Sequence, residues 1–279
     1  MITQQQELLT EPQVASNDVW SYISPSRLNL WLKCPLAFKL RYVDGVSSPP
    51  GPSLFLGKQV HEGLEIFYRH RQMNVALDAG QVCLRLLDHW DQAVTEEQMG
   101  FANLDEERKL KEKAVDLVTT YVNQLPSNEP KPIAVETRLS APLVDPTTNE
   151  DLGINLLGIV DLVLPDDDGP VVCDFKTAAK SSAPAEITHE VQLSCYAYMF
   201  RSLNQQQEGG LEIRSLIKTK TPKIETHRFE QRTEAHFRRL FTVIRAYLDD
   251  LHSGRFMYRP GWTCSMCEHR DSHCRQWRP

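Results

Sequence analysis

The hydrophobic pattern along the chain alternates between helical and strand-like stretches, and both ends lack a clear period. Apolar residues that recur every three or four positions predict helices over about 24–34, 53–71, 76–98, 104–125, 183–203 and 233–252. Short runs rich in Val, Ile and Leu predict strands over about 133–139, 156–164, 171–177, 211–219 and 223–229. We expect residues 1–20 to form a disordered tail, and residues 254–279 to need another source of order.

The two central strands flank a turn of three Asp, one Gly and two Pro, which is typical of an antiparallel hairpin. If the loop is symmetric, Leu164 pairs with Val171, and Asp161 then lies opposite Asp174. Strand alternation places Lys176 on the same face as Asp174. Opposed carboxylates within apolar strands need a compensating charge, which predicts a Mg²⁺ site with Lys176 beside it. The alternative is an ordinary hairpin whose acids lie at a solvated edge.

Composition and charge narrow the class of protein. The 279 residues can build a core without disulfides. No run of 18 apolar residues and no signal peptide is present, so we expect a cytoplasmic protein without a membrane segment. The net charge is −6, but residues 211–279 hold 14 Lys and Arg against 8 Asp and Glu, so a polyanion could approach this third. No G-x4-G-K-[ST] motif occurs, so any translocation must come from a partner.

Seven cysteines in such a chain favour metal or redox chemistry over disulfides. Three of them form the compact set Cys264-x2-Cys267-x6-Cys274, and a tetrahedral site needs one more ligand. His269 and His273 are local candidates if the metal is zinc. The other cysteines inside predicted helices or strands, which are Cys83, Cys173 and Cys195, are expected to be small core residues.

Three sequence marks together resemble the RecB-like branch of the PD-(D/E)XK nuclease superfamily. They are Gly158-Ile159-Val160-Asp161 with Asp174-Phe175-Lys176-Thr177, then Gly57, His61, Leu64 and Glu65 in a G-x3-H-x2-L-E pattern, then Gln192 and Tyr196 in a Gln-x3-Tyr pattern. The resemblance implies a restriction-endonuclease-like α/β domain with a mixed central sheet flanked by helices. Its parts would be a helical region at about 53–125, a catalytic sheet core at about 131–230 and a cluster-binding tail at about 254–279, all within one domain over 21–279.

The resemblance also implies a role for each residue of the site. His61, Asp161 and Asp174 would hold Mg²⁺ or Mn²⁺, and the Phe175 carbonyl is a possible further ligand. Lys176 would assist the attacking water. The side chains that would contact DNA near the metal are Gln192 and Tyr196. Glu136 is expected to be a solvated strand residue, with a contribution to the metal site as the alternative.

Iron–sulfur members of this branch supply a further cysteine near the N-terminus, before a Pro and an aromatic residue. Cys34-Pro35-Leu36-Ala37-Phe38 resembles that segment. The resemblance therefore implies a 4Fe-4S cluster held by Cys34, Cys264, Cys267 and Cys274, which would tie the two ends of the domain together. The spacing of six between the last two cysteines departs from the commoner five, so zinc remains the alternative.

The activity implied is metal-dependent hydrolysis of DNA, exonucleolytic on single-stranded or frayed ends in repair or recombination, with a helicase or another repair protein as partner. Two alternatives stay open. One is a non-catalytic DNA-binding or complex-assembly module that keeps the iron–sulfur cluster. The other is a nuclease that trims DNA within a CRISPR adaptation complex.

Overall fold

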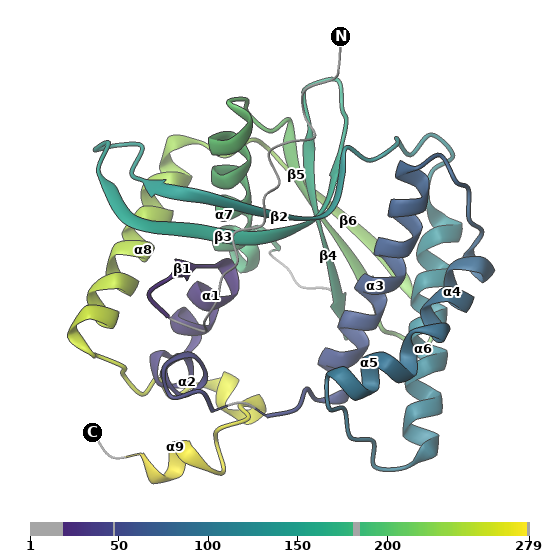
Figure 1. Cartoon of the computed structure of the whole chain (residues 1–279), viewed down its shortest axis with the longest axis horizontal. Helices are drawn as coiled ribbons and strands as arrows, with labels where there is room; N and C mark the ends of the chain where they lie inside the picture. Colours follow the sequence, from purple (N-terminus) through teal and green to yellow (C-terminus); the bar gives the residue numbers. More distant parts are fainter. Residues whose placement is uncertain (1–18, 47, 181–184, 278–279) are drawn as a thin grey trace.

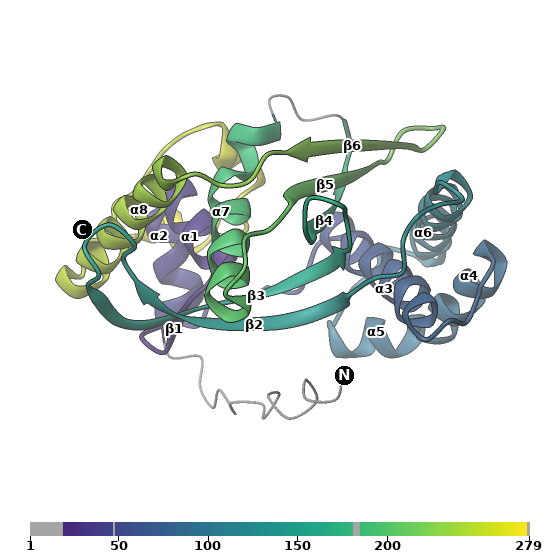
Figure 2. The ribbon, with the colours of Figure 1, turned by 90° about the horizontal axis from the view of Figure 1, so that it is seen from above.

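A six-stranded mixed sheet with helices on both of its faces forms the centre of the molecule (Figure 1, Figure 2). The computed structural model describes residues 19–46, 48–180 and 185–277, so most of the tail expected over 1–20 lies outside the described residues. The predicted mixed sheet flanked by helices is confirmed. None of the described helices is long and apolar enough to cross a membrane.

The elements follow one another as β1 (Tyr22–Ile23), α1 (Pro25–Lys33), α2 (Pro35–Phe38), η1 (Lys39–Val43), α3 (Pro52–Gln72), α4 (Ala79–Asp88), α5 (Trp90–Glu96), α6 (Leu104–Gln124), β2 (Ala134–Val144), β3 (Asp151–Leu164), β4 (Val171–Ala178), α7 (Ala185–Asn204), β5 (Gly210–Ile217), β6 (Lys223–Phe229), α8 (Glu234–Ser253), η2 (Trp262–Met266) and α9 (His273–Gln276). The helix predicted over 76–98 is divided at His89 into α4 and α5. This break places Trp90 in the core, where its ring meets the Phe55 ring edge-on at 5.2 Å.

Strand β3 organises the sheet, because it pairs with three other strands. Its antiparallel partner β2 runs along one side for most of its length. On the other side, β1 pairs in parallel with its first half and β4 pairs antiparallel with its last residues. The predicted hairpin register is confirmed, since Leu164 pairs with Val171 and Leu162 with Cys173. Beyond β4, β5 adds in parallel and β6 antiparallel.

Both faces of the sheet are buried, which explains the continuous apolar runs in β3 and β4. Helices α1, α7 and α8 cover one face, where Val160 and Val163 belong to the core. Helices α3, α4 and α6 build the core of the other face, to which Leu162 and Leu164 belong. Regular alternation would put Val160 and Val163 on opposite faces. The pleat of β3 is therefore broken beside Asp161.

A buried polar network lies beneath the α3 and α6 face. The Arg214 guanidinium on β5 donates to Glu129 Oε1 at 2.5 Å and to Glu212 Oε1 at 2.5 Å. It also donates to the hydroxyls of Tyr68 at 2.8 Å and Tyr121 at 2.7 Å. All five side chains are buried, so each charge depends on the others for its compensation.

We predict that Arg214→Met lowers the free energy of unfolding by about 3–5 kcal/mol, because two buried carboxylates lose their cation. Urea denaturation at neutral pH measures the change. Adding Glu129→Gln to this variant should recover part of the loss, since one unpaired charge is removed. A single variant as stable as the wild type would show that the network does not support the fold.

Candidate active site

Three acids lie in one transverse row across neighbouring strands: Glu136 on β2, Asp161 on β3 and Asp174 on β4. Strand β2 pairs with β3 on both sides of Glu136 and Asp161, but not at these two residues. Pairing between β3 and β4 also ends one residue before Asp161 and Asp174 would meet. The row thus coincides with a gap in the backbone hydrogen-bond ladder, both between β2 and β3 and between β3 and β4.

The Asp161 carboxylate occupies part of this interruption. Its Oδ2 accepts a hydrogen bond of 2.7 Å from the backbone N–H of Phe175, in the place where a strand carbonyl would otherwise bond. The same oxygen lies 3.5 Å from Nδ1 of His61. Burial, and then the charge of Asp174, raise the pKa of Asp161 well above its usual range. The ionised form therefore needs a cation nearby.

Helix α3 delivers His61 to this place. A Cβ on Gly57, one turn earlier, would come within 3.0 Å of Thr177 Oγ1, so the glycine lets α3 lie close against β4. The His61 ring meets the Phe175 ring edge-on at 6.0 Å. Burial lowers the pKa of His61, which keeps the imidazole neutral and able to bind a metal.

Glu136 is where the structure corrects the sequence interpretation. We expected a solvated strand residue, but its carboxylate lies with the ligand atoms of His61 and Asp161, all within 4.8 Å of one another. The cause is a backbone φ of 41° at Glu136, inside the ladder interruption. Burial, followed by the charge of Glu65, raises the pKa of Glu136 to about 7. No feature of the sequence predicts the positive φ or the β2–β3 register. The presence of an acid in this strand was the one feature that allowed a contribution to the metal site as the alternative.

Asp174 lies outside that trio of ligand atoms and has its own partners. Its Oδ1 accepts hydrogen bonds from Gln192 Nε2 at 2.9 Å and from Tyr196 Oη at 3.3 Å, both on α7. Its Oδ2 forms an ion pair with Lys176 Nζ. The structure thus brings Gln192 and Tyr196 to the acid row, where they orient Asp174, while their contact with DNA stays a prediction.

The donor set suits a hard divalent cation. Two carboxylates and a neutral imidazole converge, and burial followed by neighbouring acids raises the pKa of both Glu136 and Asp161, so a bound cation would favour their ionised forms. Oxygen-rich sites of this kind fit Mg²⁺ or Mn²⁺. The residues present therefore fit the metal that the sequence predicts, with Glu136 added to the expected ligands.

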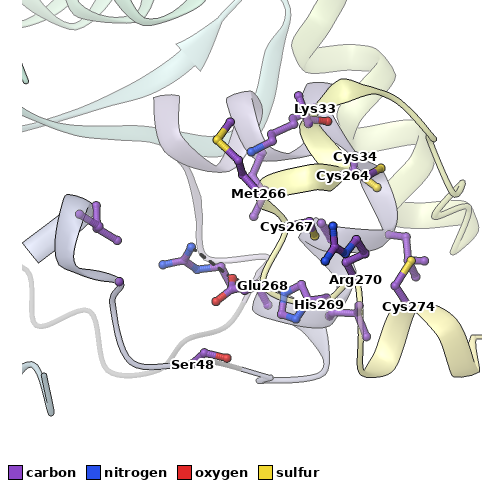
Figure 3. Close-up of a pocket in the computed structure, with 18 of the residues that line it drawn as sticks. Lys33, Cys34, Ser48, Cys264, Met266, Cys267, Glu268, His269, Arg270 and Cys274 are labelled. Atoms are coloured by element: carbon purple, nitrogen blue, oxygen red, sulfur yellow. Dashed lines mark ion pairs between the residues drawn. The ribbon is translucent and has the colours of Figure 1, made fainter. Parts of the chain in front are cut away.

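A second site lies between α2 and the segment after α8. Four free cysteines, Cys34, Cys264, Cys267 and Cys274, line one cavity of about 1030 Å³ together with His269 (Figure 3). The backbone N–H of Leu36 donates to the Met257 carbonyl at 3.2 Å, which fastens α2 to the segment after α8. Burial, followed by the charges of Cys267, Cys34 and Cys264, raises the pKa of Cys274, as expected for four thiols that lie close together. The three remaining cysteines, Cys83, Cys173 and Cys195, are buried core residues as predicted.

Comparisons with known proteins agree with this architecture. Residues 22–275 match the family model described as the PD-(D/E)XK nuclease superfamily. A solved structure from Eubacterium rectale, named "Putative exonuclease", is 12% identical and aligns over 96% of this chain and 93% of that chain, with a TM-score of 0.58. The structure of SSO0001 is also 12% identical and aligns over 88% of this chain and 93% of that chain, with a TM-score of 0.39. At 12% identity, the first likeness concerns the fold alone. No curated protein sequence matches the chain.

The raised pKa of Glu136 predicts how stability depends on pH when no metal is bound. A carboxyl whose pKa rises from 4.5 to about 7 on folding holds its proton better in the folded state. Stability should therefore fall as pH rises through this window, by about 1–3 kcal/mol, and the raised pKa of Asp161 acts in the same direction. Urea denaturation in EDTA at both ends of the window measures the effect.

Added Mn²⁺ should restore the stability lost at the higher pH, because a bound cation favours the ionised carboxylates. Glu136→Gln should flatten the pH dependence. Asp168→Asn, in the exposed β3–β4 turn, is the matched control and should leave it unchanged. An equally steep dependence in Glu136→Gln would contradict the assignment.

Proposed function

Because this chain belongs to the PD-(D/E)XK nuclease superfamily, we propose that it is a metal-dependent DNA nuclease that acts exonucleolytically on single-stranded or frayed ends. The observation that carries the proposal is the convergence of His61, Glu136 and Asp161 beside the Asp174–Lys176 ion pair. Binding of nucleic acid alone gives no reason to place three acids in one row of a sheet, with Asp161 and Asp174 buried and Glu136 half-buried. Hydrolysis of a phosphodiester does.

His61, Glu136 and Asp161 would hold the divalent ion, with Asp174 or the Phe175 carbonyl completing the set. When bound, the ion supplies Lewis-acid chemistry: it makes hydroxide available near neutral pH and neutralises phosphate charge. The protein contributes a pre-formed arrangement of these donors. The Phe175 N–H fixes the Asp161 carboxylate, and the neutral His61 imidazole needs no loss of a proton to bind.

Lys176 and α7 organise the other half of the site. The Lys176 ammonium, paired with Asp174, would orient a water and offset charge that builds on the phosphate. Gln192 and Tyr196 restrain Asp174 through one oxygen, which leaves its other oxygen to Lys176. Both side chains would also contact the DNA strand once it enters.

The cysteine cavity is the basis for the second part of the proposal. Cys34, Cys264, Cys267 and Cys274 supply the four thiolates that a 4Fe-4S cluster needs, and they come from opposite ends of the chain. Such a cluster would hold α2 and the segment after α8 together. Zinc bound by three cysteines and His269 is the alternative, because this imidazole lines the same cavity.

The first test is cleavage of linear single-stranded DNA. The wild type should degrade it with Mg²⁺ or Mn²⁺, and EDTA should abolish the reaction. Asp161→Asn should lower the rate more than about 100-fold, because a metal ligand is lost. Asp168→Asn, in the turn of the same hairpin, should cleave like the wild type. Failure of the wild type on single-stranded, duplex and flapped DNA with both metals would overturn the proposal.

The second test concerns the cysteines. Protein purified without oxygen should contain about four iron atoms per chain. Cys34→Ser should lower the iron content and the melting temperature together, because the binding energy of the cluster is also folding energy. Cys83→Ser, outside the cavity, is the control and should keep full iron. Zinc in place of iron, with His269→Ala as damaging as Cys34→Ser, would establish the alternative.

A further inference from the structure

Two lysines from different elements lie together at the end of the sheet next to the candidate active site. Lys218 follows β5 directly, and its backbone N–H donates to the Ala178 carbonyl at the end of β4, at 2.7 Å. Its Nζ donates to Ser53 Oγ in the first turn of α3 at 2.7 Å. Lys113, on α6, donates to the Thr219 carbonyl at 2.6 Å. The Lys113 ammonium therefore contacts the residue that follows Lys218.

Among the described residues, both charges have neutral hydrogen-bond partners, Ser53 Oγ for Lys218 and the Thr219 carbonyl for Lys113. Within residues 19–46, 48–180 and 185–277, neither ammonium has a carboxylate oxygen within 4.0 Å, whereas Lys109 and Lys111 of the same helix α6 are paired with acids. Burial and the charge of Lys113 lower the pKa of Lys218, so the two cations are close enough to disfavour each other. Lysines that only fastened the hairpin to the helices would gain from acidic partners. Cations held together by neutral oxygens favour an anion between them.

The backbone around the lysines also favours negative charge. Helix α3 is 21 residues long, its first turn has no acidic residue, and its N-cap Gly51 provides no side-chain hydrogen bond. Its N-terminus therefore presents positive partial charge beside Lys218 and Ser53. Lys220 and Lys223 of the same β5–β6 turn are exposed and add to this surface.

The position of the lysines ties them to the candidate active site. Ser53, Gly57 and His61 follow one another at intervals of four along a single face of α3. Along that face His61 meets Phe175, Gly57 meets Thr177 and Ser53 meets Lys218. Ser53 and His61 are eight residues apart, or about 12 Å along the helix axis. Figure 1 shows β4 running towards the N-terminal half of α3, and Figure 2 shows the β5–β6 turn beside α6.

We propose that Lys113 and Lys218, with the Ser53 hydroxyl, bind a backbone phosphate of the DNA strand at a distance from the bond that is cleaved. The inference rests on the proposed nuclease function and deepens it, since it names the surface along which the strand continues from the active site. The ligand is the phosphate backbone, and no base is read there. The contribution to affinity is therefore independent of sequence and sensitive to salt.

The test is the salt dependence of binding to a fluorescein-labelled single-stranded oligonucleotide, measured by anisotropy in Ca²⁺. For the variant Lys113→Gln/Lys218→Gln, Kd should rise several-fold, and the slope of log K against log salt should become shallower by about 0.7, the change expected when one phosphate of a single strand is no longer neutralised. The control Lys109→Gln/Lys111→Gln also removes two positive charges, both of them from α6, and should keep the wild-type slope. Lys113→Arg/Lys218→Arg keeps the charges and should also keep the slope. If Lys113→Gln/Lys218→Gln has the same slope as the control Lys109→Gln/Lys111→Gln, the inference is overturned.

A small substrate separates this inference from the proposed function. Bis(p-nitrophenyl) phosphate has a single phosphate, which cannot lie at the metal site and at a lysine site about 12 Å away at once, so its Mn²⁺-dependent hydrolysis should be the same in Lys113→Gln/Lys218→Gln and in the wild type. Loss of this hydrolysis in the variant would overturn the phosphate-binding role. If the wild type hydrolyses neither substrate but the slope difference persists, the nuclease proposal fails and the binding site stands. Displacement of the oligonucleotide by polyglutamate at equal charge would instead indicate an acidic protein partner and overturn the inference.

Discussion

The repulsion between Glu136, Asp161 and Asp174 is the constraint on which the rest of the centre depends. Regular strands would align three like charges between two buried faces, which is costly. The structure interrupts the regular ladder instead and gives each acid its own surroundings. Glu136 has a positive φ and lies near Asp161 and His61, Asp161 accepts a hydrogen bond from the Phe175 N–H, and Asp174 is held by α7 and Lys176. The broken pleat of β3 coincides with this row, and Gly57 lets α3 approach it closely.

A stiff layer of aromatic and polar residues supports the acid row from behind. The Phe175 ring contacts His61 on one side and the rings of Tyr68 and Tyr121 on the other, at 6.0 Å and 5.5 Å between centroids. The two tyrosines are in turn bonded to Arg214. The imidazole thus packs against Phe175, which in turn packs against the tyrosines of the Arg214 network. Such support keeps donor atoms in place before any ligand arrives.

The sequence predicted those parts of the site that follow from local rules. The turn composition and strand alternation were enough to predict the β3–β4 register, although the pairing ends one residue before Asp161 and Asp174, and the interval of four along a helix placed Gly57 and His61 on one face. Glu136 was missed because its role depends on a non-local register and on a backbone angle that a non-glycine residue seldom adopts. The helix division at His89 was missed for a similar reason, since only packing of Trp90 against Phe55 reveals it. The grouping of Cys34 with Cys264, Cys267 and Cys274, by contrast, was implied by the family resemblance and not by a local rule.

The cysteine cavity constrains the order in which the protein can assemble, because its lining residues lie far apart in the sequence. Cys34 is synthesised well before Cys264, Cys267 and Cys274, because 229 residues separate it from Cys264. All the acids of the central row are made long before the cavity can close. A growing chain therefore has its acid row complete while α2 still lacks the segment after α8 against which it packs. The cavity can therefore form only after the acid row has been made, and any cofactor seated there would have to arrive after Cys264, Cys267 and Cys274 have been synthesised.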